Sequence, residues 1–327
     1  DVYKRQTITD LSQAAEISDR MREQIGRAII GQSQVIQEVL IAFLAAGHVL
    51  IEGVPGLGKT LLARALAKTF EGKFARIQFT PDLMPNDITG HVIYDQNTQK
   101  FNIRRGPVFT HLLLADEINR APAKTQSALL EVMQEQQVSI EGQAMQVPQP
   151  FMTLATQNPI EQEGTYPLPE AQLDRFLLMV KIDYPSASEE QQLIEQVTGQ
   201  QIGNLLDVSR VETIIRPEQI HQLQQLTATV GVDEAVHAYA VRIVRSTRDW
   251  QGIRMGAGPR GGINLIRAAR AAAVLAGRDF VTPDDIKAMT LPVMRHRIIL
   301  SPELELEGVT ADQVLTTLLE HIEAPRQ

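Results

Sequence analysis

Residues 53–60 read Gly-Val-Pro-Gly-Leu-Gly-Lys-Thr, a complete phosphate-binding loop of the form G-x-x-x-x-G-K-T. A short apolar run, residues 48–51, precedes the loop, and a helical pattern over residues 61–67 follows it. Strand, glycine turn and helix in this order are the context in which such a loop binds phosphate. A glycine turn followed by Lys-Thr by chance is the alternative, and the flanking strand and helix make it the weaker one.

The residue types in the loop match the needs of a triphosphate. Gly53, Gly56 and Gly58 let backbone N–H groups converge on phosphate oxygens, at the positive end of a helix dipole. Lys59 is expected to reach the β- and γ-phosphates, and the Thr60 hydroxyl is expected to ligate Mg²⁺. The sequence therefore predicts binding of a nucleoside triphosphate.

Five apolar runs predict buried strands, and helical stretches separate them: residues 49–51, 74–79, 112–115, 151–156 and 177–182. This pattern is typical of an α/β core with a parallel sheet covered on both faces. Two helices, 10–28 and 33–46, lead into the phosphate loop. Two inserted stretches, 91–103 and 137–147, alternate as β-hairpins do, with turns at 96–98 and 141–143.

From residue 186 onward no strand-like run is recognised, and the remaining helical patterns cover residues 188–200, 218–229, 233–250, 260–277, 283–291 and 311–322. We therefore expect a nucleotide-binding core at 1–185, a linker at 186–217 and an all-helical lid domain at 218–327. Residues 1–9 are interpreted as a fragment edge or scar.

Composition narrows the functional class. The 327 residues suggest two domains, and the net charge of −8 gives no global attraction to nucleic acid or an anionic membrane. The chain has no cysteine, which excludes disulfides and thiolate sites. No apolar run approaches the roughly 20 residues of a membrane span, so a cytoplasmic protein that is not integral to a membrane is expected.

An apolar run at 112–115 ends in two carboxylates, Asp116 and Glu117. Alone, such a pair usually marks the end of a strand. After a complete phosphate loop, Asp116 is expected to hold the Mg²⁺ shell and Glu117 to act as the base for the attacking water. The adjacent acid favours hydrolysis over nucleotide sensing.

Three further polar residues are candidates for the same site. Asn158 follows a predicted strand and could orient the water, although an Asn-Pro turn is the alternative. Arg175 could stabilise the transferring phosphoryl group, or form a structural pair with Asp174. Arg260 opens a lid helix, where the helix dipole does not favour a cation, and this suggests contact with nucleotide.

Together these motifs resemble those of the MoxR family of AAA+ ATPases. This family belongs to the clade with an insert in helix 2. The resemblance covers about residues 15–325 and is carried by 29–32, 48–60, 115–120, 155–159 and 173–176. It implies that Lys59 and Thr60 belong to Walker A, Asp116 and Glu117 to Walker B, Asn158 to sensor 1, Arg175 to the arginine finger and Arg260 to sensor 2. The implied nucleotide contacts are Ile30, Gly31, Gly53, Pro55, Gly56, Leu57, Gly58, Lys59, Thr60, Leu61 and Arg260.

The resemblance also implies ATP and Mg²⁺ as cofactors and a homo-oligomeric ring, expected to be a hexamer, that remodels or matures partner protein complexes. A von Willebrand factor A-domain protein is the implied partner, and the two hairpins match the helix-2 insert and the pre-sensor-1 hairpin. One departure is Gly258, where the family usually has Ser before Pro-Arg. Whether Arg260 acts on its own subunit or on a neighbour stays open.

Other functions of the same clade remain as alternatives. A DNA-dependent AAA+ motor would use arginines such as Arg242, Arg245 and Arg248, but the acidic chain and the lack of interleaved aromatics favour a solvated or subunit-contacting face. A magnesium-chelatase-like ATPase subunit is a second alternative. A scaffold that binds nucleotide without hydrolysing it is disfavoured by the intact Lys59, Asp116, Glu117 and Arg175.

Overall fold

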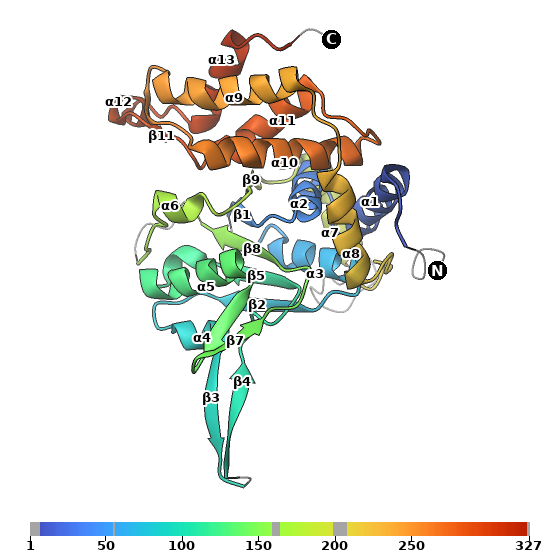
Figure 1. The fold of residues 1–327 in the computed structure, drawn as a ribbon, viewed down its shortest axis with the longest axis vertical. Coiled ribbons are helices and arrows are strands. Elements are labelled where there is room, and N and C mark those ends of the chain that lie inside the picture. The colour runs from blue at the N-terminus through green and yellow to red at the C-terminus, as the bar shows by residue number, and fades with distance from the viewer. Residues whose placement is uncertain (1–6, 55, 98, 159–163, 199–207, 326–327) are drawn as a thin grey trace.

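A five-stranded parallel sheet forms the centre of the molecule (Figure 1). The computed structural model describes residues 7–54, 56–97, 99–158, 164–198 and 208–325. The strand order is β2-β5-β8-β1-β9, with bounds Val49–Glu52 for β1, Phe74–Gln78 for β2, Leu112–Asp116 for β5, Met152–Gln157 for β8 and Leu178–Lys181 for β9. Each strand coincides with one predicted apolar run, so the predicted sheet is confirmed.

Side chains of one strand point alternately to the two faces of the sheet, and both faces are covered. Leu112 and Leu114 pack in one cluster with α1 (Leu11–Gly26), α2 (Ser33–Leu44) and α3 (Lys59–Thr69). Leu113 and Ala115 pack on the opposite face with α5 (Ala123–Glu135). A strand that is apolar at every position is therefore buried on both sides.

Two hairpins leave the core where the alternating patterns predict them. In the first, β3 (Gly90–Asp95) pairs with β4 (Lys100–Arg105), directly after the short helix α4 (Pro85–Thr89). This hairpin projects well beyond the body (Figure 1). The second hairpin pairs β6 (Gln137–Ile140) with β7 (Gln143–Gln146). A 3₁₀ turn (Ile118–Arg120) and α6 (Glu170–Leu173) complete this half of the chain.

The lid is built from α8 (Pro217–Ala228), α9 (Glu234–Asp249), α10 (Pro259–Leu275), α11 (Pro283–Met294), α12 (Pro302–Leu306) and α13 (Ala311–His321). The expectation of helices alone was wrong in one detail, because β10 (Ile253–Met255) and β11 (Ile299–Leu300) form a small antiparallel ladder. Strands of three and two residues are too short to show an alternating pattern in the sequence.

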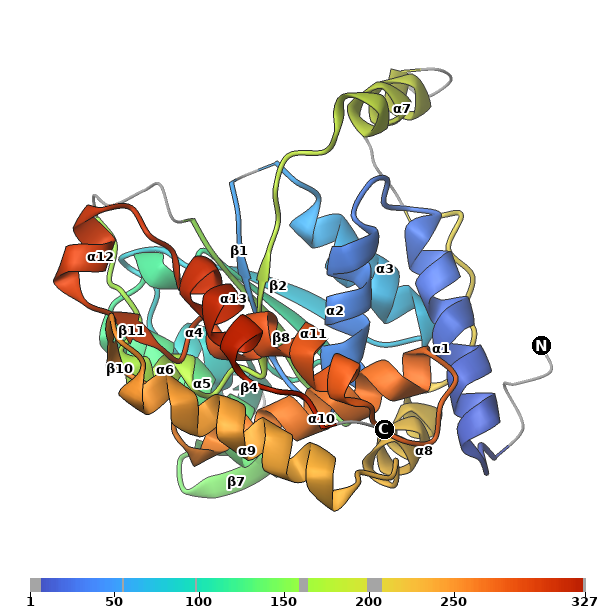
Figure 2. The same ribbon diagram turned by 90° about the horizontal axis from the view of Figure 1, so that it is seen from above.

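The lid shares a continuous apolar cluster with the core, in which α10 lies against α1 and α2. The predicted linker contains a helix, α7 (Ala187–Thr198), which stands apart from the body in Figure 2. Residues 199–207 in the middle of this linker lie outside the described residues, as do residues 1–6 of the predicted N-terminal edge. The domain boundaries stay predictions. None of the described helices has both the length and the hydropathy to cross a membrane.

Candidate ATP-binding and hydrolysis site

The phosphate loop joins β1 to α3 at the carboxyl edge of the sheet. Gly56 and Gly58 have φ of 87° and 80°, in the left-handed region that favours glycine. A Cβ at either position would meet no described heavy atom within 4 Å, so the loop is open on that side. Gly53 is required by a close approach, since a Cβ there would lie 2.6 Å from the Ile182 carbonyl oxygen. Pro55 lies outside the described residues.

Lys59 begins α3 and turns back over the loop. Its Nζ donates a hydrogen bond to the Gly53 carbonyl oxygen over 2.5 Å. Burial lowers the pKa of Lys59, while the carboxylates of Asp116 and Glu117 oppose this shift by attracting the ammonium group. Thr60 follows in the first turn of α3 and is half-buried, whereas the Leu61 side chain is buried in the core. Leu61 can therefore offer a nucleotide only its backbone.

The segment between α1 and α2 lies beside the loop. The Gln32 side-chain amide donates a hydrogen bond to the Leu57 carbonyl oxygen over 3.0 Å, which ties this segment to the loop. Ile30 is half-buried, and Gly31 is exposed with φ of 75°. Glu189 of α7 covers Gly31 so closely that a Cβ at Gly31 would lie 2.7 Å from the Glu189 Cδ.

Asp116 ends β5 and Glu117 follows it at the same edge of the sheet, and Thr156 of the neighbouring strand β8 forms hydrogen bonds with both residues. The Thr156 hydroxyl donates to Asp116 Oδ1 over 2.7 Å and accepts from the Glu117 backbone N–H over 2.8 Å. Glu117 has a left-handed backbone, with φ of 55° and ψ of 52°, which is uncommon for a residue other than glycine. Such backbone strain is typical of functional sites.

Strand β2, the outermost strand of the sheet next to β5, supplies two further hydrogen-bond donors to the acids. Arg76 donates to Asp116 Oδ2 from Nη2 over 2.6 Å and from Nε over 3.1 Å. Gln78 donates to Glu117 Oε2 over 2.7 Å. Sequence reasoning missed Arg76, Gln78 and Thr156. The signal that could have found them is strand order, since β2 and β8 flank β5, and order cannot be read from a single sequence.

Asn158 directly follows β8, which lies between β1 and β5 in the sheet. Its side chain is buried, with 7% of the residue exposed. The strand order therefore places Asn158 between the phosphate loop and the acid pair. Lys59, Thr60, Asp116, Glu117 and Asn158 all lie at one edge, as the sequence predicts.

The donor set at this edge fits Mg²⁺ and a triphosphate. Mg²⁺ prefers hard oxygen ligands and is usually held by one or two protein oxygens together with substrate phosphates. The Thr60 hydroxyl and the Asp116 carboxylate are such ligands. A carboxylate offers about four lone-pair sites, so Asp116 can keep its bond to Thr156 and still hold an ion.

Arg175 and Arg260 lie at the opposite, amino edge of the sheet. Both line a cavity of about 260 Å³ together with His48, which precedes β1, and Leu177, which precedes β9. Parallel strands rise about 3.3 Å per residue, so the six residues of β8 separate the two edges by roughly 20 Å. The structure does not bring these two arginines to the phosphate loop of their own chain.

Fixed contacts hold the two arginines at this amino edge. Arg175 donates from Nη1 to the Leu130 carbonyl oxygen over 2.8 Å. Arg260 lies 3.6 Å from Asp174, and the same carboxylate accepts a hydrogen bond from Arg297 over 2.8 Å. The Arg297 side chain is 1% exposed, and burial lowers its pKa to about 10, so it stays charged at neutral pH.

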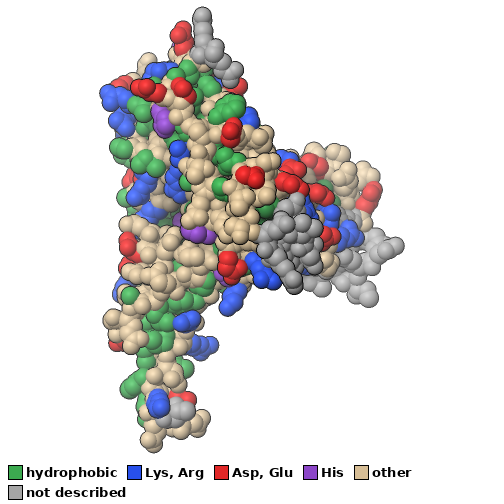
Figure 3. Space-filling view, turned by 45° about the vertical axis from the view of Figure 1, so that its right-hand side comes forward, with side chains coloured by type: hydrophobic (Ala, Val, Ile, Leu, Met, Phe, Trp, Pro, Cys, Tyr) green, Lys and Arg blue, Asp and Glu red, His purple; other side chains and the backbone are tan. Residues whose placement is uncertain are grey.

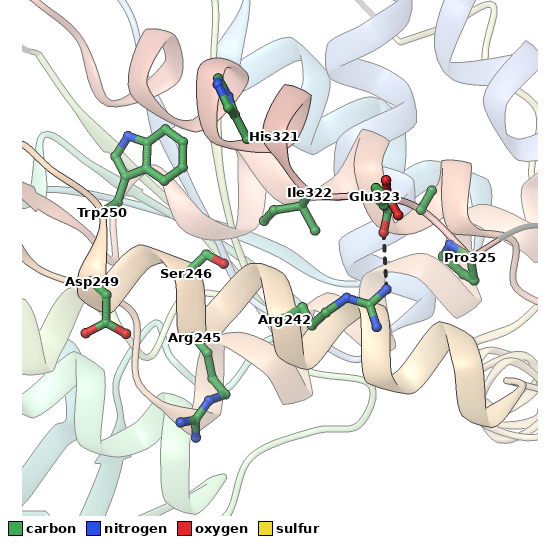
Figure 4. A pocket seen from close by; sticks show the side chains of 10 residues that line it. Arg242, Arg245, Ser246, Asp249, Trp250, His321, Ile322, Glu323 and Pro325 are labelled. Atoms are coloured by element: carbon green, nitrogen blue, oxygen red, sulfur yellow. Dashed lines mark hydrogen bonds between the residues drawn. The ribbon is translucent and has the colours of Figure 1, made fainter.

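A larger cavity, of about 940 Å³, lies in the lid between α9 and the C-terminal residues 321–325. Figure 4 shows Arg242 directed toward Glu323, whose carbonyl oxygen accepts a hydrogen bond from it over 3.2 Å. The rings of Trp250 and His321 meet edge to face at 5.4 Å. All residues that line this cavity belong to the lid, so it is separate from the phosphate loop.

The sequence matches two family models. The model of the ATPase family associated with various cellular activities (AAA) matches residues 48–178, and that of the AAA lid domain matches residues 245–318. A crystal structure of a candidate ATPase from Cytophaga hutchinsonii superposes with a TM-score of 0.87 at 40% identity, over 97% of this chain and 99% of that one.

Two relatives align over nearly the whole chain. Protein YeaC of Bacillus subtilis is 44% identical over 305 residues, which are 93% of this chain and 94% of YeaC. Chaperone MoxR1 of Mycobacterium tuberculosis is 43% identical over 326 residues, covering 96% of this chain and 84% of that protein. On these identities and on the phosphate loop, acid pair and lid described above, the chain belongs to the MoxR family of AAA ATPases.

Proposed function

We propose that this protein hydrolyses ATP with Mg²⁺ at a site that two neighbouring chains complete together. The observation that carries the proposal is the separation of the functional residues between the two edges of one sheet. The carboxyl edge binds the nucleotide, and the arginines at the amino edge serve the nucleotide of the next chain. We propose that Arg260 acts on a neighbour together with Arg175, because both arginines lie at the amino edge.

Each residue at the carboxyl edge has a separate task. Lys59 would exchange its bond to Gly53 for bonds to phosphate oxygens. Thr60 and Asp116 would hold Mg²⁺, which would supply positive charge beside the phosphates. Glu117 accepts the proton of the attacking water, and the Asn158 amide orients that water. Ile30 and Gly31 flank the adenine of the nucleotide, because Gln32 fixes their segment against the phosphate loop.

Arg175 and Arg260 contribute charge in the transition state. An arginine supplied by a neighbour stabilises the charge that spreads over the transferring phosphoryl oxygens, and such an arginine typically raises the rate by about 10³–10⁵. Because the two edges differ, the contact between chains is head-to-tail, and such contacts close into rings when the rotation permits. We propose a ring of six, as the family resemblance implies.

The proposed action is the remodelling of a partner protein complex, with a von Willebrand factor A-domain protein as one partner. A relative named as a chaperone supports this reading. The projecting β3–β4 hairpin offers a surface for such a partner, since Tyr94 and Phe101 are 53% and 74% exposed and their tilted rings lie 5.1 Å apart. Figure 3 shows hydrophobic side chains along this projection. The proposed site of action is the cytoplasm, where ATP is available.

Mixing two inactive variants tests the shared site. Lys59→Ala removes a residue of the carboxyl edge, and Arg175→Ala removes one of the amino edge. Each variant alone is expected to hydrolyse ATP slowly. With random mixing, about a quarter of the contacts join the intact carboxyl edge of an Arg175→Ala chain to the intact amino edge of a Lys59→Ala chain. The mixture should therefore regain up to about a quarter of wild-type activity.

The control is Arg104→Ala, which removes an exposed arginine of the hairpin and should leave activity unchanged. Size-exclusion chromatography in ATP shows whether the mixed chains assemble. An assembled mixture that stays as inactive as its components would contradict the shared site, because an arginine acting within its own chain cannot be complemented.

A further inference from the structure

An apolar groove of about 480 Å³ runs between α9 and α10 on the surface of the lid. Ala240, Val241 and Val244 form the wall on α9, and Ile263 and Ile266 form the wall on α10. Val241 and Ile263 are 53% and 61% exposed, so this apolar surface faces solvent in the single chain. Exposed apolar surface of this kind, when it has a polar rim, usually marks an interaction site.

Arginines form the rim of the groove. Arg245 and Arg248 come from α9, and Arg267 and Arg270 come from α10. Within the described ranges none of the four forms an ion pair, and no acidic residue lines the groove. The Nε of Arg270 is buried and has no hydrogen-bond partner among the described residues. The groove therefore fits a short helix that carries apolar and acidic side chains.

Helix α7 has this chemistry. Glu190 and Glu195 are exposed on its surface, and Ile194 between them is 56% exposed. Residues 190 and 194 are one helical turn apart, so they lie on the same face of the helix. The capping hydrogen bonds of Glu189 with Ser186 begin the helix, at 2.8 Å from the Ser186 N–H and 2.7 Å from its hydroxyl.

Helix α7 and the groove lie on opposite sides of one chain. Figure 2 shows α7 on one side of the molecule and α9 with α10 on the other, so α7 cannot enter its own groove. The groove adjoins the cavity that contains Arg175 and Arg260, because Ile263 and Arg267 line both. Helix α7 adjoins the nucleotide side, because Glu189 covers Gly31. In a head-to-tail contact the two surfaces meet.

We propose that α7 of one subunit docks into the arginine-rimmed α9–α10 groove of the next subunit. This inference rests on the proposed shared site, since it assumes the same head-to-tail contact, and it adds a second point of attachment to that contact. Ile194 fills the apolar groove, and Glu190 and Glu195 meet the rim arginines. Because Glu189 also touches Gly31, the docked helix joins the adenine side of one subunit to the lid of its neighbour.

Cysteine cross-linking tests the contact directly, because the chain contains no cysteine of its own. Ile194→Cys is prepared in one chain, and Val241→Cys or Ile263→Cys in another, one on each wall of the groove. Mixed in ATP and Mg²⁺ and treated with a short bis-maleimide, each pair should give a covalent dimer on a denaturing gel. A chain that carries both cysteines should give a ladder of higher multimers.

Leu306→Cys is the matched control, because Leu306 is 90% exposed but lies on α12, outside the groove. Mixed with Ile194→Cys it should give no dimer above background. If particles of wild-type size assemble but neither groove pair cross-links, the docking is wrong. The proposal of a shared ATP site would not be affected by that result. If no assembly forms and the Lys59 and Arg175 variants do not complement, the proposed function and the docking both fail.

Charge exchange provides a second readout. Glu190→Lys with Glu195→Lys should raise the concentration for half-maximal assembly by about tenfold, because like charges then face each other. Arg245→Glu with Arg248→Glu should do the same, and the four changes in one chain should restore assembly. Failure of the combined variant to recover would contradict the pairing. If Arg245→Glu with Arg248→Glu instead abolishes binding of a labelled DNA oligonucleotide and leaves assembly intact, the groove binds nucleic acid and the docking is wrong.

Discussion

Thr156 Oγ1 lies 2.7 Å from Asp116 Oδ1 and donates a hydrogen bond to it. The same oxygen accepts a hydrogen bond from the Glu117 N–H, so one hydroxyl on β8 sets the positions of Asp116, which ends β5, and Glu117, which follows it. The residue is 1% exposed, so solvent does not replace these bonds. Thr156 is a positioning residue, because it acts through the acids.

Thr156→Val keeps the shape of the side chain and removes both hydrogen bonds. We expect kcat for ATP hydrolysis to fall by about 10²-fold, because a misplacement of about 1 Å at catalytic groups costs this much, while KM changes little. Thr156→Ser restores the hydroxyl and should recover most of kcat. Steady-state kinetics of the three proteins provide the check. Equal losses in the Val and Ser variants would point to packing instead of the hydroxyl.

Glu117→Gln removes the proposed base and keeps the size of the side chain. We expect ATP to bind with nearly unchanged affinity and turnover to fall by at least about 10²-fold, the usual contribution of a general base. Binding is measured by titration with a fluorescent ATP analogue, and turnover by phosphate release. Unchanged turnover would remove Glu117 from the mechanism. Glu305→Gln, at an exposed position of α12, is a control in which both quantities should keep their wild-type values.

His48 provides a pH prediction. Burial lowers its pKa to about 4, and its ring is held neutral, with Nδ1 accepting from the Thr153 N–H and Nε2 donating to the Met133 carbonyl oxygen. The unfolded chain binds the proton at a higher pH than the folded one. The stability that the neutral ring contributes is therefore complete above pH 6.5 and is lost as the pH falls toward 4, by up to about 3 kcal/mol.

His48→Gln keeps a donor and an acceptor but does not titrate. Urea unfolding at pH 7.5 and pH 4.5 should show a smaller loss of unfolding free energy on acidification in this variant than in the wild type. The comparison is necessary because burial also lowers the pKa of His296, which titrates in the same direction in both proteins. Identical pH dependence in the two proteins would exclude His48 as the source.

Arg297 is predicted to stabilise the junction of core and lid. Its guanidinium donates to the Asp174 carboxylate, to the Phe176 and Leu177 carbonyl oxygens and to that of Val293. Arg297→Met removes these donors from buried acceptors and should lower the unfolding free energy by about 3 kcal/mol. Thermal and denaturant unfolding measure the change. Arg104→Met on the hairpin, an exposed site, should change it by less than about 0.5 kcal/mol.

The fold could be predicted from the sequence where the pattern is local. Each strand of the central sheet is an apolar run. Residues 282–285 read Thr-Pro-Asp-Asp, a common helix start, and the Thr282 side chain accepts from the Asp285 N–H at the start of α11. The loop, the acid pair and Asn158 each follow a predicted strand. The carboxyl ends of parallel strands share an edge, so this part of the site followed from the pattern alone.

The remainder depended on contacts between distant segments. Arg76 reaches Asp116 across 40 positions of sequence, and Arg297 reaches Asp174 across 123. Neither pair leaves a periodic pattern, because the spacing reflects strand order and lid placement. The position of Arg260 beside Asp174, away from its own phosphate loop, could not be predicted either, because it depends on how the lid is placed on the core. Helix α7, in contrast, was predicted by the helical pattern at 188–200, and it lies within the predicted linker because a helix can also connect two domains.

The length of the strands in the central sheet has a consequence for the regulation of ATP hydrolysis. On the proposed arrangement, with the nucleotide at one edge and Arg175 at the other, an isolated chain is expected to bind ATP and hydrolyse it slowly. On the proposed arrangement the rate per chain rises with protein concentration and falls on dilution, so ATP consumption reports assembly. The length of the strands thereby keeps the two sets of residues apart within one chain, and rapid hydrolysis is confined to assembled chains.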